Sequence, residues 1–334
     1  MTSTNSPSLP KPLFLTPVGK DYLWGGERLN TEFAKSIPLS PLAETWECST
    51  HPDGESVVAL GEFAQKTLRQ VLAEHPKYLG SRHENTRGEL PILVKFIDAR
   101  QDLSVQVHPD DRYAAQYEGG QRGKIEMWYV LDATPQASLV YGLRRTLTPE
   151  HLRSAIAQGC LEPYLQRLPV HTDDTFYLDA GTIHAIGQGC LVAEIQENSN
   201  LTYRLYDYDR TDATGNRRPL HVDKALAVAN LNATPPPRQP IRHLIYRPGC
   251  ARELLSRCRY FQVERLLLNT ERLRERLCLE TDGLSFQVLL CLQGCGALSS
   301  AGETWDFFKG DCIFLPANTR LHLHGNARFL LVRC

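Results

Sequence analysis

The chain of 334 residues is long enough for one large domain or two ordinary ones, and its 42% hydrophobic residues can supply sizeable cores. A net charge of −1 points to neither a nucleic-acid partner nor an anionic membrane. The polar N-terminus lacks the basic start and apolar run of a signal peptide, and no stretch approaches ~20 consecutive apolar residues, so we expect a soluble cytoplasmic protein without a membrane partner.

Short apolar runs separated by Gly, Asp and Asn dominate the chain and predict a mainly β protein with a few short helices. Residues 1–12, rich in Ser, Thr and Pro, are expected to form a flexible arm. The helical spacing of four apolar residues predicts a helix over 67–79. A second helix is expected from Thr148, an N-cap followed by proline, to about Gln158.

Three predicted strands carry potential metal ligands. Apolar and polar residues alternate over 103–108, so Gln106 and His108 project from one face, about 7 Å apart along the strand. A strand over 123–130 has Glu126 near its start, and a strand over 179–184 ends at His184, just after a glycine turn. Two imidazoles, a carboxylate and an amide oxygen suit Zn²⁺ or a similar divalent cation, with room left for a substrate.

Any one of these residues alone is more often a surface residue or a satisfied core residue than a ligand. Their combination, however, resembles the two motifs of cupin β-barrels: His-x-His with a later Glu, then a His on a neighbouring strand. The segment 174–184 is similar to the second motif, and Gln106-Val107-His108 is similar to the first, with glutamine in place of one histidine. The resemblance implies a jelly-roll barrel with a metal site.

A proline-rich segment divides the chain. Residues 233–240 contain four prolines, which can continue neither a helix nor a central strand. We therefore expect a linker over 233–244, preceded by a catalytic cupin domain over 13–232 that holds the metal site and helical insertions. Strand-like runs over 286–292 and 310–318 predict a second cupin-like barrel over 245–334.

The second barrel is expected to lack the metal ligands. When its Gly-Asp turn at 310–311 is aligned with the turn before His184, Leu321 falls at the histidine position. His322 and His324 alternate with leucines and would share one strand face, but no upstream Gln/His pair and Glu accompany them. This barrel is expected to support the first one or to form a lid over it.

Ten cysteines show no compact disulfide framework. Cys291 and Cys295 are spaced too widely for a C-x-x-C pair, and several others lie within apolar runs. We expect reduced, mostly buried thiols.

Several blocks of the sequence resemble the signature blocks of type I mannose-6-phosphate isomerases in their short bacterial form. The resemblance runs from about residue 12 to 232, in order and at family-like spacing, and beyond it only the general pattern matches. The blocks are TP to WGG (16–26), WECSTHPDG (46–54), PILVKFIDA (91–99), LSVQVHPDD (103–111), GKIEMWYVL (123–131) and TYRLYDYDR (202–210).

The resemblance implies an isomerase that interconverts mannose 6-phosphate and fructose 6-phosphate through an enediolate, with one Zn²⁺ or another divalent cation per chain. It implicates Glu194 as the proton-transfer base and Arg204 as the catalytic arginine. Lys124 would share a strand face with Glu126 and is a further cation for the substrate or its phosphate. Glu194 could instead be a structural ion-pair partner, and Lys95 could lie in the pocket or in the framework.

One position departs from the family pattern. Many relatives have Asp four residues before the arginine, whereas this chain has Asn200. An amide cannot act as a general base near neutral pH. If the carboxylate opens the sugar ring in relatives, Asp207, Asp209 or water must do so here.

Two other functions stay open at this point. A cupin oxygenase with Fe²⁺ would use the same ligand types, but Arg204 would then have no evident role. A non-catalytic sugar-binding cupin with a structural metal would need neither the acid–base group nor the cations around the site. Metal analysis combined with an assay of ketose formation separates the three functions. The sequence assigns no oligomeric state and no range of phosphosugars.

Overall fold

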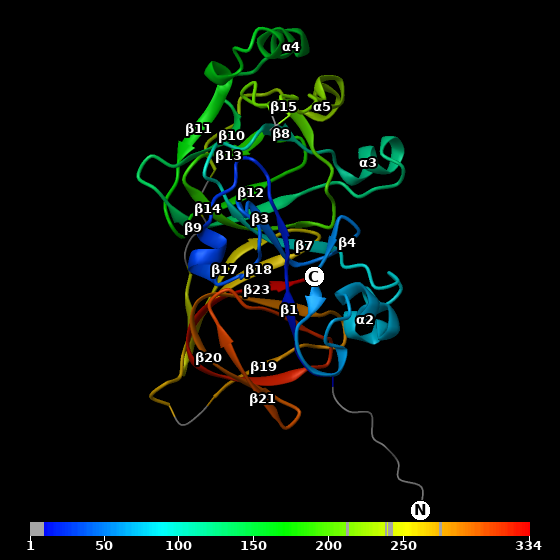
Figure 1. Cartoon of the computed structure of the whole chain (residues 1–334), viewed down its shortest axis with the longest axis vertical. Helices are drawn as coiled ribbons and strands as arrows, with labels where there is room; N and C mark the ends of the chain where they lie inside the picture. Colours follow the sequence, from blue (N-terminus) through cyan, green and yellow to red (C-terminus); the bar gives the residue numbers. More distant parts are fainter. Residues whose placement is uncertain (1–9, 212–213, 238, 240–242, 274–275) are drawn as a thin grey trace, which may run out of the picture.

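The computed structural model describes residues 10–211, 214–237, 239, 243–273 and 276–334. The described chain is mainly β, which confirms the predicted fold class (Figure 1). Its strands form three antiparallel sheets of ten, six and five strands and one two-stranded ribbon. Most of the first two thirds of the chain forms the upper part of Figure 1, and the yellow to red strands of the C-terminal third form the lower part, beside the early elements β1 and α2.

Two sheets of the N-terminal part pack face to face. The core cluster between them joins Trp128 and Val192 of the six-stranded sheet with Leu139 and Ile186 of the five-stranded sheet. The six-stranded sheet consists of β2 (Val18–Lys20), β3 (Glu44–Cys48), β7 (Ile92–Asp98), β9 (Glu126–Ala133), β12 (Thr175–Leu178) and β14 (Cys190–Glu197). The five-stranded sheet consists of β8 (Val105–Val107), β10 (Ser138–Leu143), β11 (Leu165–Pro169), β13 (His184–Ile186) and β15 (Tyr203–Tyr206).

The ten-stranded sheet contains the C-terminal strands and two strands from the beginning of the chain. The early strand β1 (Leu13–Thr16) pairs with β22 (Cys312–Leu315) on one side and with β6 (Val57–Val58) on the other. The chain therefore starts in the C-terminal sheet before it enters the metal-ligand sheets. The other strands are β16 (Ile245–Arg247), β17 (Cys250–Arg257), β18 (Gln262–Asn269), β19 (Leu277–Glu280), β20 (Gln287–Ser300), β21 (Glu303–Phe308) and β23 (Arg320–Arg333); β4 (Thr50–His51) and β5 (Gly54–Glu55) form the ribbon.

The six-stranded sheet is a wall shared by the two parts of the molecule. Strand β7 is buried along its whole length, because successive side chains point to opposite faces and both faces are covered. Val94 and Phe96 pack in one cluster with Phe286 and Val332 of the C-terminal part. Lys95, between them, points to the other face and lines a cavity. The C-terminal part thus supports the outer face of this sheet.

The short helices lie in connections between strands. Helix α2 (Leu68–Glu74) has a capping box in which Thr67 accepts from the Gln70 amide. The single helix predicted over 67–79 is wrong in its second half, because Pro76 breaks it and a 3-10 turn follows over Pro76–Leu79. Helix α4 (Pro149–Ala157), capped by Thr148, confirms the other prediction. The remaining helices are α1 (Arg28–Phe33), α3 (Asp111–Tyr117), α5 (Val222–Val228) and 3-10 turns over Gly61–Phe63 and Glu162–Tyr164.

Parts of the predicted arm and linker, residues 1–9, 238 and 240–242, lie outside the described residues. At the end of the arm, Lys11 pairs with Glu303 of β21 at 2.5 Å. All ten cysteines are free thiols; Cys48, Cys190, Cys250, Cys291 and Cys312 are buried. The division of the chain into domains at 233–244 stays a prediction.

Candidate active site

Four candidate ligands come from three strand ends that face one another between the two N-terminal sheets. Gln106 lies within β8 and His108 just after it, and Gln106 is in register with His184 of β13. Glu126 is the first residue of β9 in the facing sheet. The prediction that a strand ends at His184 is wrong: Gly181, with φ of +84°, breaks the extended chain, and His184 is instead the first residue of β13.

Three buried side chains converge with their lone pairs toward one point. The Nε2 atoms of His108 and His184 are 3.1 Å apart, and the Glu126 oxygens lie 3.3 Å and 3.5 Å from them. The Nδ1 atom of His184 is 2.8 Å from the Thr182 carbonyl oxygen, so a proton on Nδ1 leaves Nε2 as a lone-pair donor. Burial, reinforced by Lys124, lowers the pKa of His108 to about 3. Neutral imidazoles beside a carboxylate fit a divalent cation.

The Gln106 side chain lies beside the same three residues. Its Nε2 atom is 3.4 Å from Nε2 of His184. A half turn of the terminal amide exchanges its nitrogen and oxygen, which brings an acceptor to this position. Gln106 can therefore supply a fourth ligand.

Lys124 lies against the ligand group. Its Nζ is 2.6 Å from Glu126 Oε1 and 3.4 Å from His108 Nε2, and its side chain is 4% exposed. Burial alone would raise the pKa of Glu126, but Lys124 and His108 hold it well below the ordinary range, so this carboxylate is ionised. The strand predicted from residue 123 begins only at Glu126, and Lys124 occupies the segment before it.

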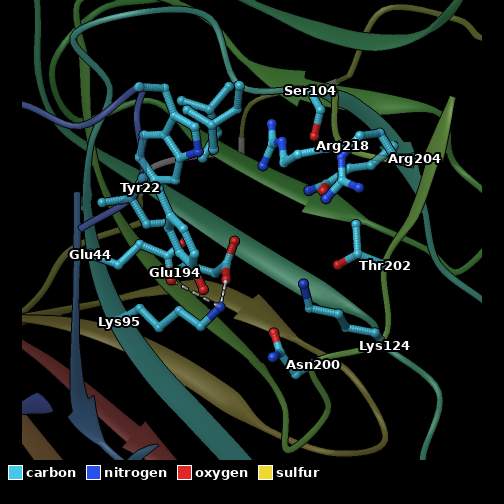
Figure 2. A pocket seen from close by; sticks show the side chains of 15 residues that line it. Tyr22, Glu44, Lys95, Ser104, Lys124, Glu194, Asn200, Thr202, Arg204 and Arg218 are labelled. Carbon is cyan, nitrogen blue, oxygen red and sulfur yellow. Dashed lines mark ion pairs between the residues drawn. The ribbon is translucent and has the colours of Figure 1, made fainter. Parts of the chain in front are cut away.

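Glu194 lies on β14 and lines the same cavity as Lys95 and Lys124 (Figure 2). Its Oε2 accepts a hydrogen bond from Trp128 Nε1 at 2.9 Å, and its Oε1 lies 3.3 Å from Lys95 Nζ. Lys95 also pairs with Glu44 at 3.6 Å, so one ammonium lies between two carboxylates. Burial and the charge of Glu126 raise the pKa of Glu194. For Lys95 the structure decides in favour of the pocket.

Two arginines lie together at another side of the cavity (Figure 2). Arg204 of β15 donates from Nη1 to the Pro219 carbonyl oxygen at 3.0 Å, and its Nε is buried without a partner among the described residues. Burial and the nearby charge of Arg218 lower the pKa of Arg204. Arg218 makes a two-point contact with Asp207 at 2.8 Å and 2.6 Å. This side of the cavity is positively charged.

One cavity of about 280 Å³ is lined by Gln106, Lys124, Lys95, Glu194 and the two arginines. His108, Glu126 and His184 lie buried behind Gln106 and Lys124, which contact them. The lining of the cavity comes from residues between Tyr22 and Arg218, and within the described chain no residue of the C-terminal part contributes. The C-terminal part instead shares a core cluster with the outer face of the six-stranded sheet, and its role as support or lid stays a prediction. Sequence reasoning missed several lining residues: Tyr22, Trp24, Glu44, Ile97, Leu103, Ser104, Ile186, Thr202 and Arg218.

Asn200, at the departing position, also lines the cavity. Of the two aspartates that could replace the family carboxylate, Asp207 is buried and held by Arg218 and Arg210, and Asp209 is exposed and paired with Arg217. The Asn200 amide instead donates to Asp53 Oδ2 at 2.7 Å. The fold thus places the Asp53 carboxylate beside the side chain of Asn200.

The histidines of the C-terminal part are separate from this site. His322 and His324 are half-buried on β23 and alternate with buried Leu321 and Leu323, which confirms the period-two pattern. His324 Nδ1 is 3.2 Å from the Thr270 hydroxyl. Neither histidine belongs to the metal-ligand group.

Comparison with known proteins places this geometry in a known context. Residues 13–130 match the family model described as phosphomannose isomerase type I, catalytic domain. The chain is 39% identical to the mannose-6-phosphate isomerase ManA of Bacillus subtilis over 92% of this chain and 93% of that protein. It is 44% identical to the probable mannose-6-phosphate isomerase GmuF of the same organism over 66% and 69% of the two chains.

The solved structures include a protein of the same overall shape. The crystal structure of the mannose 6-phosphate isomerase from Bacillus subtilis superposes with a TM-score of 0.88 at 34% identity, over 97% of this chain and 99% of that one. Among the described residues, no helix has both the length and the apolar character needed to span a membrane.

Proposed function

This chain belongs to the type I phosphomannose isomerase family, and we propose that it interconverts mannose 6-phosphate and fructose 6-phosphate in the cavity between its two N-terminal sheets. The observation that carries the proposal is one cavity lined by the buried carboxylate of Glu194 and a pair of arginines. Gln106 and Lys124 also line it and contact the buried group of His108, Glu126 and His184. A structural metal site would need neither the acid–base group nor the arginines.

We assign the bound ion as one Zn²⁺ per chain. Two neutral imidazoles, one ionised carboxylate and an amide oxygen match the nitrogen and oxygen ligands that zinc takes in catalytic sites. When bound, the ion supplies positive charge to the two substrate oxygens on which negative charge develops. His108, His184 and Glu126 hold it, and Lys124 keeps Glu126 ionised.

Glu194 is assigned as the base that moves the proton between the two carbons. Isomerisation requires a group that takes a carbon-bound proton and returns it to the neighbouring carbon. Trp128 fixes one oxygen of Glu194, and Lys95 lies beside the other. Because burial and Glu126 raise its pKa, Glu194 is a stronger base than an exposed carboxylate and can hold the proton between the two transfers.

The arginine side of the cavity is assigned to the charged end of the substrate. The positive charges of Arg204 and Arg218 repel each other, and a dianionic phosphate relieves that repulsion. The hydroxyl groups of Ser104 and Thr202 line the cavity with them. Lys124 is already paired with Glu126, so we move the phosphate contact from Lys124 to this pair and give Lys124 a role beside the metal ligands.

The proposal is tested by assaying the purified protein for fructose 6-phosphate formation from mannose 6-phosphate, before and after chelation. Turnover should be lost on full removal of the metal and restored by Zn²⁺. Activity that survives demetallation would reject the metal role. Oxygen consumption restored by Fe²⁺ would favour an oxygenase, and binding of the sugar without turnover would favour a sugar-binding protein. We also propose a cytoplasmic location, in keeping with ten free thiols.

A further inference from the structure

A second cavity, of about 320 Å³, lies on the C-terminal part of the molecule and shares no lining residue with the metal-site cavity. It is lined by the turn between β17 and β18, the segment before β20, the end of β23 and Arg82 from the N-terminal part. The backbone joins the two parts beside it: the amides of Ser81 and Arg82 donate to the carbonyl oxygens of Gly283 and Leu284 at 3.0 Å and 3.1 Å. The cavity is therefore built where the two parts meet.

The charge in this cavity is strongly unbalanced. Its lining contains four arginines, Arg82, Arg257, Arg259 and Arg333, and one acidic side chain, Asp282. Asp282 is engaged with the backbone amides of Leu284 and Ser285 at 2.9 Å and 3.3 Å.

The four guanidinium groups differ in their contacts. Arg82 donates to the main-chain oxygen of Cys334 at 3.3 Å, and Arg257 donates to the neutral side chain of Gln262 at 2.6 Å. Arg259 lies over the Tyr260 ring, 5.7 Å from its centroid. Arg333 approaches Glu264 at 3.8 Å, but that carboxylate also faces Arg252 at 3.9 Å. Within the described part of the chain, Arg257 and Arg259 form no ion pair.

Hydrogen-bond donors in the cavity also lack partners. Ser285 is 7% exposed, and its hydroxyl has no hydrogen-bond partner among the described residues. The Nε–H of Arg333 is buried and equally unpartnered. Buried polar groups without partners are costly. A tetrahedral anion with several acceptor oxygens would satisfy the hydroxyl, the Nε–H and the guanidinium groups together.

We propose that this cavity is a second anion site, which binds the phosphate group of a small phosphorylated metabolite or free phosphate, apart from the metal centre. Arg257, Arg259 and Arg333 provide the charge, and Ser285 provides a neutral donor from the cavity wall. The inference does not depend on the proposed function, because no residue of this cavity contributes to the metal-site cavity.

Isothermal titration calorimetry of the metal-loaded protein with inorganic phosphate tests the proposal. The wild-type chain should bind one equivalent of phosphate at each cavity. The double variant Arg257→Ala/Arg259→Ala should lose the equivalent at the second cavity, or bind that equivalent roughly tenfold more weakly for each charge-assisted hydrogen bond that is removed. Ser285→Ala removes the hydroxyl without changing charge and should weaken the same equivalent by a smaller factor. Glucose 6-phosphate in a parallel titration separates the two sources: equal affinity assigns free phosphate, and tighter binding assigns a phosphate ester.

The matched control is Arg247→Ala, which removes an exposed arginine of β16 that does not line the cavity. It should keep the wild-type stoichiometry. The double variant should also keep wild-type kcat and KM for mannose 6-phosphate, because the cavity at the metal site is untouched. The proposal is overturned if the double variant and the control bind phosphate as the wild type does, or if the wild type binds only the equivalent that Arg204→Ala removes. Loss of isomerase activity on chelation is measured separately and does not bear on it.

Discussion

At the scale of single residues, the metal centre depends on protonation states that the protein imposes. His108 and His184 are both buried, and burial lowers the pKa of each imidazole, so both stay neutral and can donate a lone pair near neutral pH. Glu126 stays ionised because Lys124 is 2.6 Å away. Lys124, which the sequence suggests as a substrate contact, thus stabilises the ionised form of the metal ligand Glu126.

Histidine substitutions should show which histidines bind the metal: those of the ligand group or those of the C-terminal part. His108→Ala or His184→Ala should lose bound metal and activity together, because the remaining imidazole, carboxylate and amide hold the cation too weakly. His322→Ala and His324→Ala are the matched controls and should keep both, since these residues lie on β23 outside the ligand group. Metal content by atomic emission and kcat are measured on the same samples. Equal metal loss from the β23 variants would contradict the assignment.

Substitutions at Glu194 and Arg204 should distinguish proton transfer from phosphate binding. Glu194→Gln keeps the shape and an acceptor for Trp128 but cannot carry a proton, so it should suppress both turnover and solvent deuterium incorporation into the product. Arg204→Ala should raise KM for mannose 6-phosphate by roughly tenfold or more, the scale expected for loss of a charge-assisted contact to the phosphate, with metal content intact.

The control for these two variants is Glu74→Gln, at the exposed end of α2, which should be indistinguishable from wild type. Near-wild-type turnover in Glu194→Gln together with a near-wild-type KM in Arg204→Ala would reject the mechanism.

Lys124→Ala provides a further comparison: if Lys124 supports Glu126, metal affinity should fall, whereas a phosphate contact would raise KM alone.

At the scale of elements, the end of β14 is joined to helix α3 through a pair of carboxyl groups. Glu197 accepts from the Ile125 amide at 3.0 Å and lies next to Asp111, which accepts from Gly123 N at 2.9 Å and Tyr260 OH at 2.7 Å. Burial and the charge of Asp111 raise the pKa of Glu197 to about 8. Glu197 therefore keeps its proton near neutral pH.

This pair predicts a pH dependence of stability. Because the folded-state pKa of Glu197 lies above its ordinary value of 4.5, its contribution is fully present below pH 4.5 and is lost as the pH rises through about 8. Glu197→Gln imitates the protonated form, so it should flatten the fall in stability between these pH values and exceed the wild type at pH 8. Urea denaturation at several pH values measures this, with the exposed Glu84→Gln as control. Parallel pH profiles of Glu197→Gln and wild type would refute the pairing.

At the scale of the whole molecule, a single core cluster crosses from one part to the other. It includes Leu13 and Phe96 from the beginning of the chain and Phe286, Phe314 and Val332 from its end. Strand β1 adds backbone hydrogen bonds to the same junction through its pairing with β22. Burial of apolar surface stabilises in proportion to its area, so neither part keeps its core when separated.

Calorimetry of the metal-loaded chain should therefore show one unfolding transition. A fragment ending at residue 232 should aggregate or stay unfolded, because the outer faces of β7, β9 and β14 would be exposed to water. Two separate transitions, or a well-folded monomeric fragment with metal bound, would show instead that the linker at 233–244 separates independent domains.

The sequence by itself determined the fold class, the ends of helix α4 and the choice of His108, Glu126 and His184, which the structure brings together. These features are local: alternation with period two, an N-cap before proline, and ligand residues carried on recognisable blocks. Where the sequence misplaced an element, the cause was equally local, namely Pro76 within the expected helix and Gly181 before His184.

Only the tertiary structure decided which charges meet. Lys95, Glu44 and Glu194 come from three strands of one sheet, and their contact depends on the register between those strands. Arg218 reaches the cavity from a loop without regular structure, and no periodicity marks such a residue. The position of β1 among the C-terminal strands is likewise non-local, because pairing over almost 300 residues is selected by the packing of the whole chain rather than by neighbouring residues.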